Sequence, residues 1–257
     1  EIIAMHKCQN DEYLAIISGK NLIAAEQKIN QLFVYKRVHK AQGHDSFEFV
    51  NRIVLKDMPH FSQVSMDFHF KIQEGIERTE ILFAKIDQIF SMNFMTGAIQ
   101  TIYQIKVNLN KQPQYFKVND DQSVYIVSSV MDGIYININL NQEVDIDDTY
   151  DISNIMEIIF DTDDDIFYIL TNKYEEKLGF FVLKLQESNP FNGQFLIKWK
   201  NKLDIGDTNI YVLRNHETGI KEIIVSYKTI YINTFNVVVM DISKESKKSL
   251  IFRHESF

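Results

Sequence analysis

Acidic side chains are the residues of this sequence whose number and spacing come closest to a chemical function. No Lys or Arg occurs between Lys117 and Lys173, whereas Asp recurs throughout that interval. A block of one charge creates a negative field that attracts a basic partner, and the encounter weakens as salt is added. The sequence therefore predicts an acidic docking surface. Its members are Asp145, Asp147, Asp148, Asp151, Asp161, Asp163, Asp164 and Asp165.

The same acidic residues have two other interpretations. Asp favours turns because its side chain hydrogen-bonds to nearby backbone, so the block could consist of solvated turn residues. Asp161, Asp163 and Asp165 also have the alternate spacing with which carboxylates converge on calcium. Ile166 and Asn172, however, stand where an EF-hand loop has Gly and Glu. We therefore predict neither a metal nor a cofactor.

The rest of the composition argues against several classes of function. Seven scattered His residues and the single Cys8 form no zinc-ligand set, and nine Gly residues form no phosphate-binding loop. A net charge of -8 disfavours nucleic-acid binding, and no apolar run reaches the ~20 residues of a membrane helix. One cysteine cannot form an internal disulfide and is typical of a reducing compartment. We expect an intracellular, non-catalytic protein that binds neither nucleic acid nor membrane.

Strand patterns fill the chain, and helix patterns are nearly absent. Ile, Val, Phe and Tyr are abundant, and these side chains pack well on pleated sheets. A hairpin pattern, two apolar runs around a polar turn, recurs five times. Its copies span residues 4–19, 68–85, 115–129, 157–171 and 210–226. A third and a fourth strand are predicted after each copy, and the fourth strand of the third copy is predicted at Glu143–Tyr150.

A repeat of this length predicts a modular β-fold. A lone four-stranded sheet has two apolar faces, and radial stacking of such sheets buries both of them. We predict an all-β fold, a β-propeller of about five four-stranded blades in a single region over residues 1–257. A β-sandwich or two smaller β-domains are the alternatives. The predicted blades lie near residues 1–56, 57–107, 113–150, 155–201 and 207–257.

The rhythm of these strands resembles that of WD40-like propellers. The stretch Ile89–Ala98 resembles the turn between the third and fourth strands of such a blade, which commonly ends in Thr-Gly. Phe160–Thr171 resembles the turn between the first two strands. No Trp-Asp dipeptide closes a third strand, so the resemblance is to a degenerate propeller. Seven blades are the commoner number in WD40-like proteins, and a chain that begins inside an apolar run is consistent with further blades before Glu1.

The resemblance implies a rigid scaffold for protein–protein interaction in a larger complex. The richness in Ile, Asn, Lys and Gln is similar to that of ciliate-type proteins, which implies a cytoplasmic location in a cytoskeletal or ciliary assembly. The expected partners are other proteins of that assembly, bound through a basic segment. The alternative is a five-bladed propeller enzyme that processes glycosides with a pair of axial carboxylates. Glu157 and Glu222 are the acidic residues that fall within strand patterns.

Overall fold

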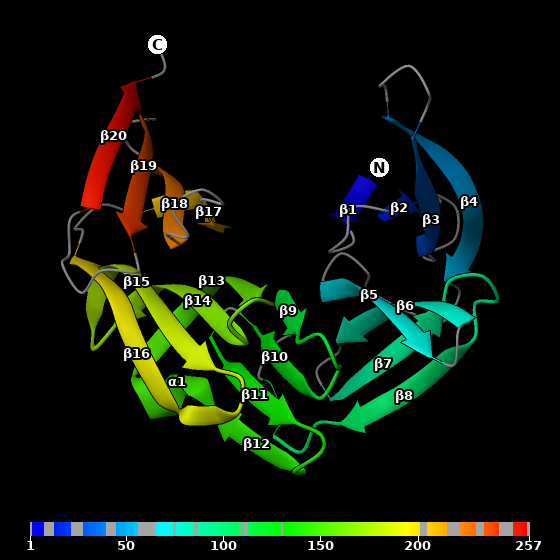
Figure 1. The fold of residues 1–257 in the computed structure, drawn as a ribbon, viewed down its shortest axis with the longest axis horizontal. Helices are drawn as coiled ribbons and strands as arrows, with labels where there is room; N and C mark the ends of the chain where they lie inside the picture. Colours follow the sequence, from blue (N-terminus) through cyan, green and yellow to red (C-terminus); the bar gives the residue numbers. More distant parts are fainter. Residues whose placement is uncertain are drawn as a thin grey trace. The chain divides into compact units, whose positions relative to one another are not determined.

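The computed structural model describes residues 2–7, 13–21, 28–39, 45–55, 65–73, 76–84, 87–107, 109, 113–129, 131–200, 205–214, 221–229, 234–241 and 249–255. Within these ranges the chain forms twenty β-strands and one short helix (Figure 1). The strands group into four-stranded sheets, five in all, in which consecutive strands are hydrogen-bonded neighbours and pair antiparallel. The all-β prediction is confirmed. No helix of the described part is long and apolar enough to cross a membrane.

The chain divides into two compact units, and the first comprises Glu1–Asn108 and Gln112–Phe116. It holds two sheets. The first sheet consists of β1 (Ile2–Lys7), β2 (Tyr13–Asn21), β3 (Lys28–His39) and β4 (Asp45–Leu55). The second sheet consists of β5 (Ser65–Gln73), β6 (Ile76–Ala84), β7 (Gln88–Asn93) and β8 (Ile99–Gln104).

The core of the first unit lies between these two sheets. Alternate residues of a strand point to one face, and the buried residues of β2 and β3 alternate in this way. They pack against buried residues of β6 and β7 in one apolar cluster. The cluster consists of Tyr13, Ala15, Leu32, Val34, Ile81, Phe83, Phe90, Met92 and Phe94. Each of these sheets therefore has one apolar face, and the two sheets stack because stacking buries both faces.

The turn predicted within Ile89–Ala98 is confirmed between β7 and β8. The side-chain oxygen of Asn93 accepts hydrogen bonds from the backbone N–H groups of Met95 and Thr96, each at 3.0 Å. Gly97 has a φ of 74°, a left-handed conformation that Gly adopts readily. Its N–H donates to the Asn93 carbonyl at 2.7 Å. The Asn and Gly residues thus fix the reversal.

The second unit comprises Leu109–Lys111 and Lys117–Phe257. The third sheet consists of β9 (Tyr115–Val118), whose first two residues are assigned to the first unit, β10 (Val124–Ser128), β11 (Gly133–Asn137) and β12 (Gln142–Asp145). The fourth sheet consists of β13 (Ile152–Asp161), β14 (Ile166–Tyr174), β15 (Lys177–Gln186) and β16 (Asn189–Lys200). The fifth sheet consists of β17 (Ile205–Arg214), β18 (Lys221–Thr229), β19 (Thr234–Asp241) and β20 (Ser249–Glu255).

Central strands of the second unit are buried at consecutive positions. All five residues of β10 are buried, and so are Ile166–Leu170 of β14. A strand that is buried at every position has both of its faces covered. On one face of the fourth sheet, Tyr168 and Phe180 pack against Ile223 and Val225 of the fifth. Face-to-face stacking of neighbouring sheets therefore builds this core as well.

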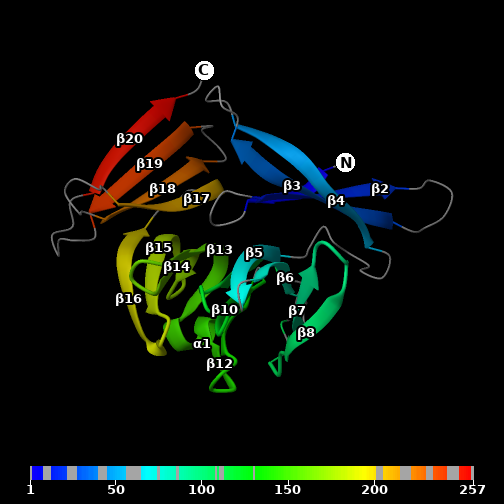
Figure 2. The ribbon, with the colours of Figure 1, turned by 45° about the vertical axis from the view of Figure 1, so that its right-hand side comes forward.

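The predicted strand at Glu143–Tyr150 is wrong in its second half. β12 ends at Asp145, and Ile146–Tyr150 forms the helix α1, which leads to β13 (Figure 2). The Asp145 carboxylate caps the start of the helix by accepting the Asp148 N–H at 3.1 Å. Asp151 ends it in a left-handed conformation with φ of 50°. Asp is a favoured helix N-cap, and this local capping overrides the strand pattern.

Tyr150 connects α1 to the outer strand of the fourth sheet. Its hydroxyl donates to the Pro190 carbonyl and accepts from the Gly193 N–H, both at 2.6 Å. A Cβ atom on residue 193 would lie 2.5 Å from the Tyr150 hydroxyl and ring. This approach is closer than van der Waals contact allows. Only glycine fits beside the ring.

We expect Gly193→Ala to lower the free energy of unfolding of the second unit by about 1–3 kcal/mol, the usual range for overpacking. Urea denaturation followed by circular dichroism measures the change. In a Tyr150→Ala background the cost of Gly193→Ala should largely disappear, because the clash has been removed. Equal costs in both backgrounds would show that the ring does not set the requirement for glycine.

Candidate binding surface

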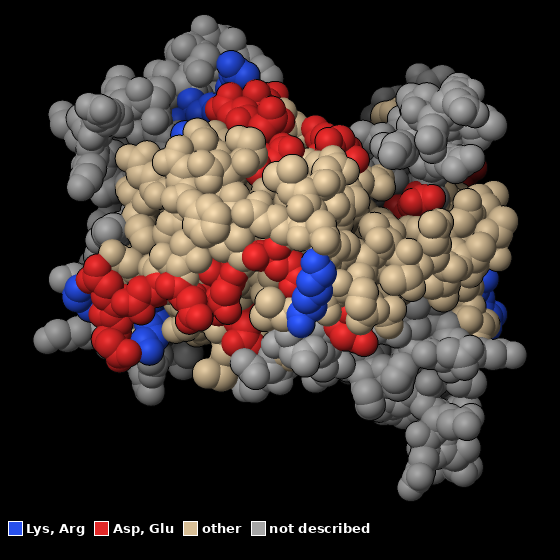
Figure 3. Space-filling model, turned by 90° about the horizontal axis from the view of Figure 1, so that it is seen from below, with Lys and Arg blue, Asp and Glu red and all other residues tan. Residues whose placement is uncertain are grey.

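The strand β13 divides the predicted acidic surface into two groups. Asp145, Asp147, Asp148 and Asp151 precede its first residue, whereas Asp161 and the three Asp residues of the following turn lie at its far end. Ten extended residues at about 3.3 Å each separate the two groups by about 30 Å. In the left half of Figure 3, acidic side chains likewise gather on two sides of a band of uncharged residues. The structure thus brings the eight carboxylates together as two sets of four.

The first group surrounds α1. Asp145 and Asp151 cap the helix, and Asp148 is exposed. Both oxygens of Asp147 are buried, and neither has a hydrogen-bond partner among the described residues. Burial raises the pKa of Asp147 to about 8, and the charges of Asp145, Asp132 and Asp148 raise it further, whereas the nearby Gly133 amide lowers it. The Asp147 carboxyl is therefore largely protonated at neutral pH.

The second group forms the turn between β13 and β14, and two cations of the fifth sheet bind it. The Lys221 amine contacts Asp161 at 2.7 Å and Asp164 at 2.8 Å. It also lies 3.7 Å from Asp163, to which Arg214 donates a hydrogen bond at 3.0 Å. Lys221 and Asp161 are only 10% and 9% exposed, whereas Asp163 and Asp164 are about half exposed. An ion-pair network with the buried Lys221–Asp161 pair at its centre and half-exposed partners around it therefore joins the fourth sheet to the fifth.

These contacts favour the ionised forms of Asp164 and Lys221. Hydrogen bonding to Lys221 lowers the pKa of Asp164. Burial lowers the pKa of the Lys221 amine, but its hydrogen bonds with Asp161 and Asp164 outweigh burial, and the pKa lies above its ordinary value. The Lys221 ammonium itself lies among these carboxylates, in the position that a bound metal ion would otherwise take.

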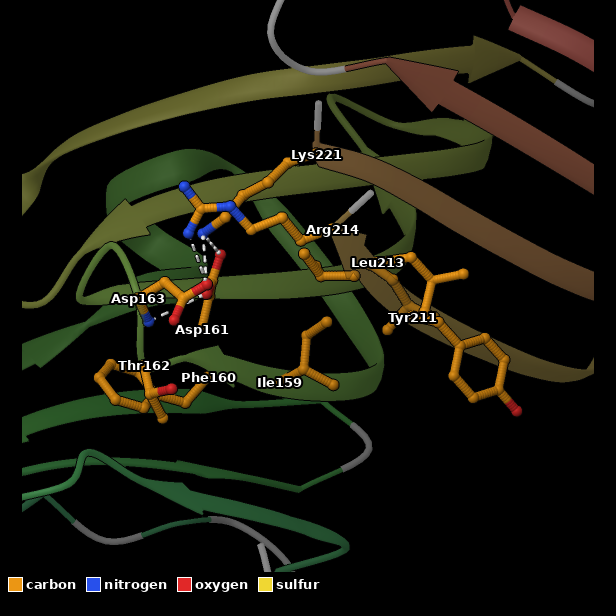
Figure 4. Close-up of a pocket in the computed structure, with 11 residues that line it drawn as sticks. Ile159, Phe160, Asp161, Thr162, Asp163, Tyr211, Leu213, Arg214 and Lys221 are labelled. Atoms are coloured by element: carbon orange, nitrogen blue, oxygen red, sulfur yellow. Dashed lines mark hydrogen bonds and ion pairs between the residues drawn. The ribbon is translucent and has the colours of Figure 1, made fainter. Parts of the chain in front are cut away.

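An open cleft of about 330 Å³ lies beside the network, between β13 and β17. Figure 4 shows Lys221 and Arg214 reaching Asp161 and Asp163 at one end of the cleft, and Tyr211 at the other. Tyr211 and Leu213 are 51% and 52% exposed although both are large and apolar. The cleft thus combines an apolar wall with a charged rim.

Turns of the third and fourth sheets add carboxylates at the same end of β13. The Asn119 amide donates to Glu187 at 2.8 Å, and the Tyr135 hydroxyl donates to the Glu187 carbonyl at 2.5 Å. Burial raises the pKa of Glu187, and the charges of Asp165, Asp121 and Asp120 contribute to the rise. The negative field at this end is therefore wider than the turn alone.

Glu157 and Glu222, the carboxylates of the enzyme alternative, do not form a pair. Glu157 accepts a hydrogen bond from the Ile210 N–H at 2.6 Å. Glu222 lies on β18, opposite Leu213 of β17. Leu213 follows Ile210 by three positions, which is about 10 Å along the strand. Burial raises the pKa of Glu157 to about 7, the Ile210 amide and the charge of Lys117 lower it, and no carboxylate of the described residues contributes. Paired catalytic carboxylates raise one another's pKa, so this geometry does not support a glycosidase pair at Glu157.

Sequence reasoning did not single out Lys221, Arg214, Tyr211 or Leu213. For Lys221, the sequence does contain a pattern from which burial could be predicted. Lys221 alternates with Ile223 and Val225 on β18, and these three residues are all buried. A Lys on the core side of a strand needs an internal carboxylate, and the nearest acidic turn of the preceding repeat supplies it.

Comparison with known proteins supports the fold. No protein-family model and no curated protein sequence matches the chain. Among solved structures, the WD40 domain of SCAP from fission yeast matches with a TM-score of 0.55 and 8% identity, over 100% of this chain and 62% of that one. The complex of the fission yeast SREBP–SCAP binding domains matches with a TM-score of 0.51 and 10% identity, over 97% of this chain and 63% of that one. The fold is therefore that of a WD40-like β-propeller, and the chain spans less than two thirds of the length of these structures.

Two sequence-based expectations stay predictions after this comparison. The matches do not determine the number of blades, and they do not concern the ciliate-type resemblance. The predicted blade boundaries and the docking role of the acidic residues likewise stay predictions.

Proposed function

We propose that this chain is a non-catalytic protein–protein interaction module within a larger assembly. The observation that carries the proposal is the cleft between β13 and β17, whose wall exposes Tyr211 and Leu213. Large apolar side chains that stay exposed in a concave site are typical of protein-binding surfaces. The fold agrees with this function, because one of the similar structures is a complex between binding domains of two proteins.

The setting that we propose is a cytoskeletal or ciliary assembly in the cytoplasm, on the basis of composition. The partner that we propose binds through a basic segment, since acidic side chains dominate both ends of β13. The acidic group at the β13–β14 turn is the better candidate for this contact, because it adjoins the cleft.

Native complexes test the proposal directly. The tagged chain, expressed in the cells from which it comes, should elute from size-exclusion chromatography well ahead of the same chain purified alone. Chemical cross-linking and mass spectrometry should then identify specific protein neighbours, fewer of them at high ionic strength than at low. Elution at the size of the isolated chain, without cross-linked neighbours, would contradict the proposal.

A second measurement addresses the enzyme alternative. A panel of aryl glycosides should not be turned over by the purified chain. Turnover that disappears in a Glu157→Gln variant would show that the enzyme interpretation is correct and the scaffold interpretation is not.

A further inference from the structure

We infer that the cleft between β13 and β17 binds a linear segment of a partner protein in which a bulky apolar residue lies close to a Lys or Arg. The inference rests on the proposed interaction function and specifies the chemistry of the partner. It follows from three properties of the cleft. The wall is apolar, carboxylates outnumber cations at the rim, and the cations Lys221 and Arg214 already bind carboxylates of the cleft.

The apolar wall provides the contact for the bulky residue. Tyr211 and Leu213 are two positions apart on β17, so both side chains leave the same face of the strand. Ile159 of β13 lines the cleft from the other side. Burial of the half-exposed Tyr211 and Leu213 side chains favours an apolar occupant. An aliphatic or aromatic side chain of a partner matches both the volume of the cleft and its apolar wall.

The charge around the cleft selects for a basic neighbour of that side chain. Among the described residues, carboxylates outnumber cations around the cleft. The carboxylates are Asp120, Asp121, Glu157, Asp161, Asp163, Asp164, Asp165 and Glu187, and the cations are Lys117, Lys184, Arg214 and Lys221. The field is therefore negative, and it attracts a cationic side chain.

The engaged cations disfavour an anionic ligand at the same place. Lys221 contacts three carboxylates, and Arg214 is hydrogen-bonded to Asp163. A small molecule is usually oriented by a few polar groups that converge on a closed pocket. Here the charged groups bind each other and the cleft is open, so an extended peptide is the better match.

A phage-displayed library of random linear peptides, selected on the purified chain, tests the inference. We expect the selected sequences to share a bulky apolar residue within a few positions of Lys or Arg. A fluorescein-labelled peptide with the selected consensus then serves as the probe in fluorescence polarisation. Its affinity should fall as ionic strength rises, because part of the attraction is electrostatic.

Variants locate the binding site. Leu213→Ser should weaken the probe about tenfold, since it removes a central apolar contact, whereas Leu140→Ser, at a residue that is 66% exposed in another turn, should leave affinity unchanged. Asp165→Asn should weaken the probe about threefold and reduce its salt dependence. This change conserves the backbone, because Asn also tolerates the φ of 55° at this position. Asp148→Asn, at the exposed acidic group around α1, is the matched charge control.

The outcomes are distinct. The inference is overturned if no consensus emerges, if the consensus lacks either the apolar or the basic residue, or if Leu213→Ser binds the probe as well as the unaltered chain. A greater loss in Asp148→Asn than in Asp165→Asn also overturns it, because the contact would then lie around α1. The native complexes of the proposed function can persist in each of these cases, so failure of the cleft does not imply failure of the interaction function.

Discussion

Replacing Lys221 with Met is expected to lower the free energy of unfolding of the second unit by about 3 kcal/mol at pH 7. The change keeps the length and apolar stem of the side chain but removes the ammonium that contacts Asp161, Asp163 and Asp164. Asp161 is 9% exposed, so water cannot replace the lost contact fully. A buried charge without its partner is among the most destabilising defects in a protein core.

Urea denaturation at pH 7, followed by circular dichroism, measures this loss as a shift of the midpoint. Lys177→Met is the matched control, because Lys177 is paired with Glu175 at a site where both side chains are 43% exposed. Exposed ion pairs contribute about 0–1 kcal/mol. Equal effects of the two substitutions would show that the Lys221 network does not stabilise the fold.

The effect of Lys221→Met should depend on pH in a defined direction. The pKa of Asp164 is lowered from 3.8, so its pairing contributes stability above pH 3.8, and this contribution is lost as pH falls through the lowered value. The pKa of Lys221 is raised from 10.5, so its contribution lasts until pH rises above that value. The difference between the variant and the unaltered chain should therefore shrink in acid.

Asp147→Asn is expected to stabilise the second unit at neutral pH, by about 2–4 kcal/mol. The pKa of Asp147 is raised from 3.8 to about 8. As pH rises from 4 to 8, the unfolded chain loses this proton whereas the folded chain retains it, so stability falls across that window. Asn removes the titration and keeps the shape of the side chain. The neighbouring carboxylates then no longer repel a charge at this position.

Thermal or urea unfolding between pH 4 and pH 9 tests this expectation. The stability of the Asp147→Asn variant should change less with pH than that of the unaltered chain, with the largest gain at pH 8 and above. Asp148→Asn, next in sequence and exposed, should change the profile far less, because the charge of Asp148 is the smallest of the causes that shift the pKa of Asp147. A variant that is less stable at pH 8 would mean that the Asp147 carboxyl has a stabilising partner.

The strands could be predicted because their information is local. Alternating apolar residues and an intervening polar turn lie within about fifteen residues, and each sheet pairs only strands that follow one another. The helix α1 was missed because it depends on one interaction, the hydrogen bond between Asp145 and the Asp148 amide, rather than on a periodic pattern. A short helix of this kind leaves no repeat for a pattern to detect.

The binding surface could be predicted only in part, for a geometric reason. Adjacent acidic runs suggested one surface, but the ten-residue strand β13 places the runs at opposite ends. The cations that bind the second run lie further along the chain; Lys221 follows Asp161 by sixty positions. Contacts of that range depend on which sheets are neighbours, and the hydrophobic pattern does not specify this.

The side-chain contacts of the fourth sheet have a consequence for how such a fold can evolve. Its outer strand binds Tyr150 of α1, Glu187 joins it to the preceding sheet, and Glu157 and Asp161 join it to the following one. Modules that stack through apolar faces alone could be duplicated, deleted or reordered with little penalty. This one carries polar contacts that match only the sheets on either side of it. Its position in the series is therefore encoded in its own side chains, and a copy inserted elsewhere in the chain would leave those groups unmatched.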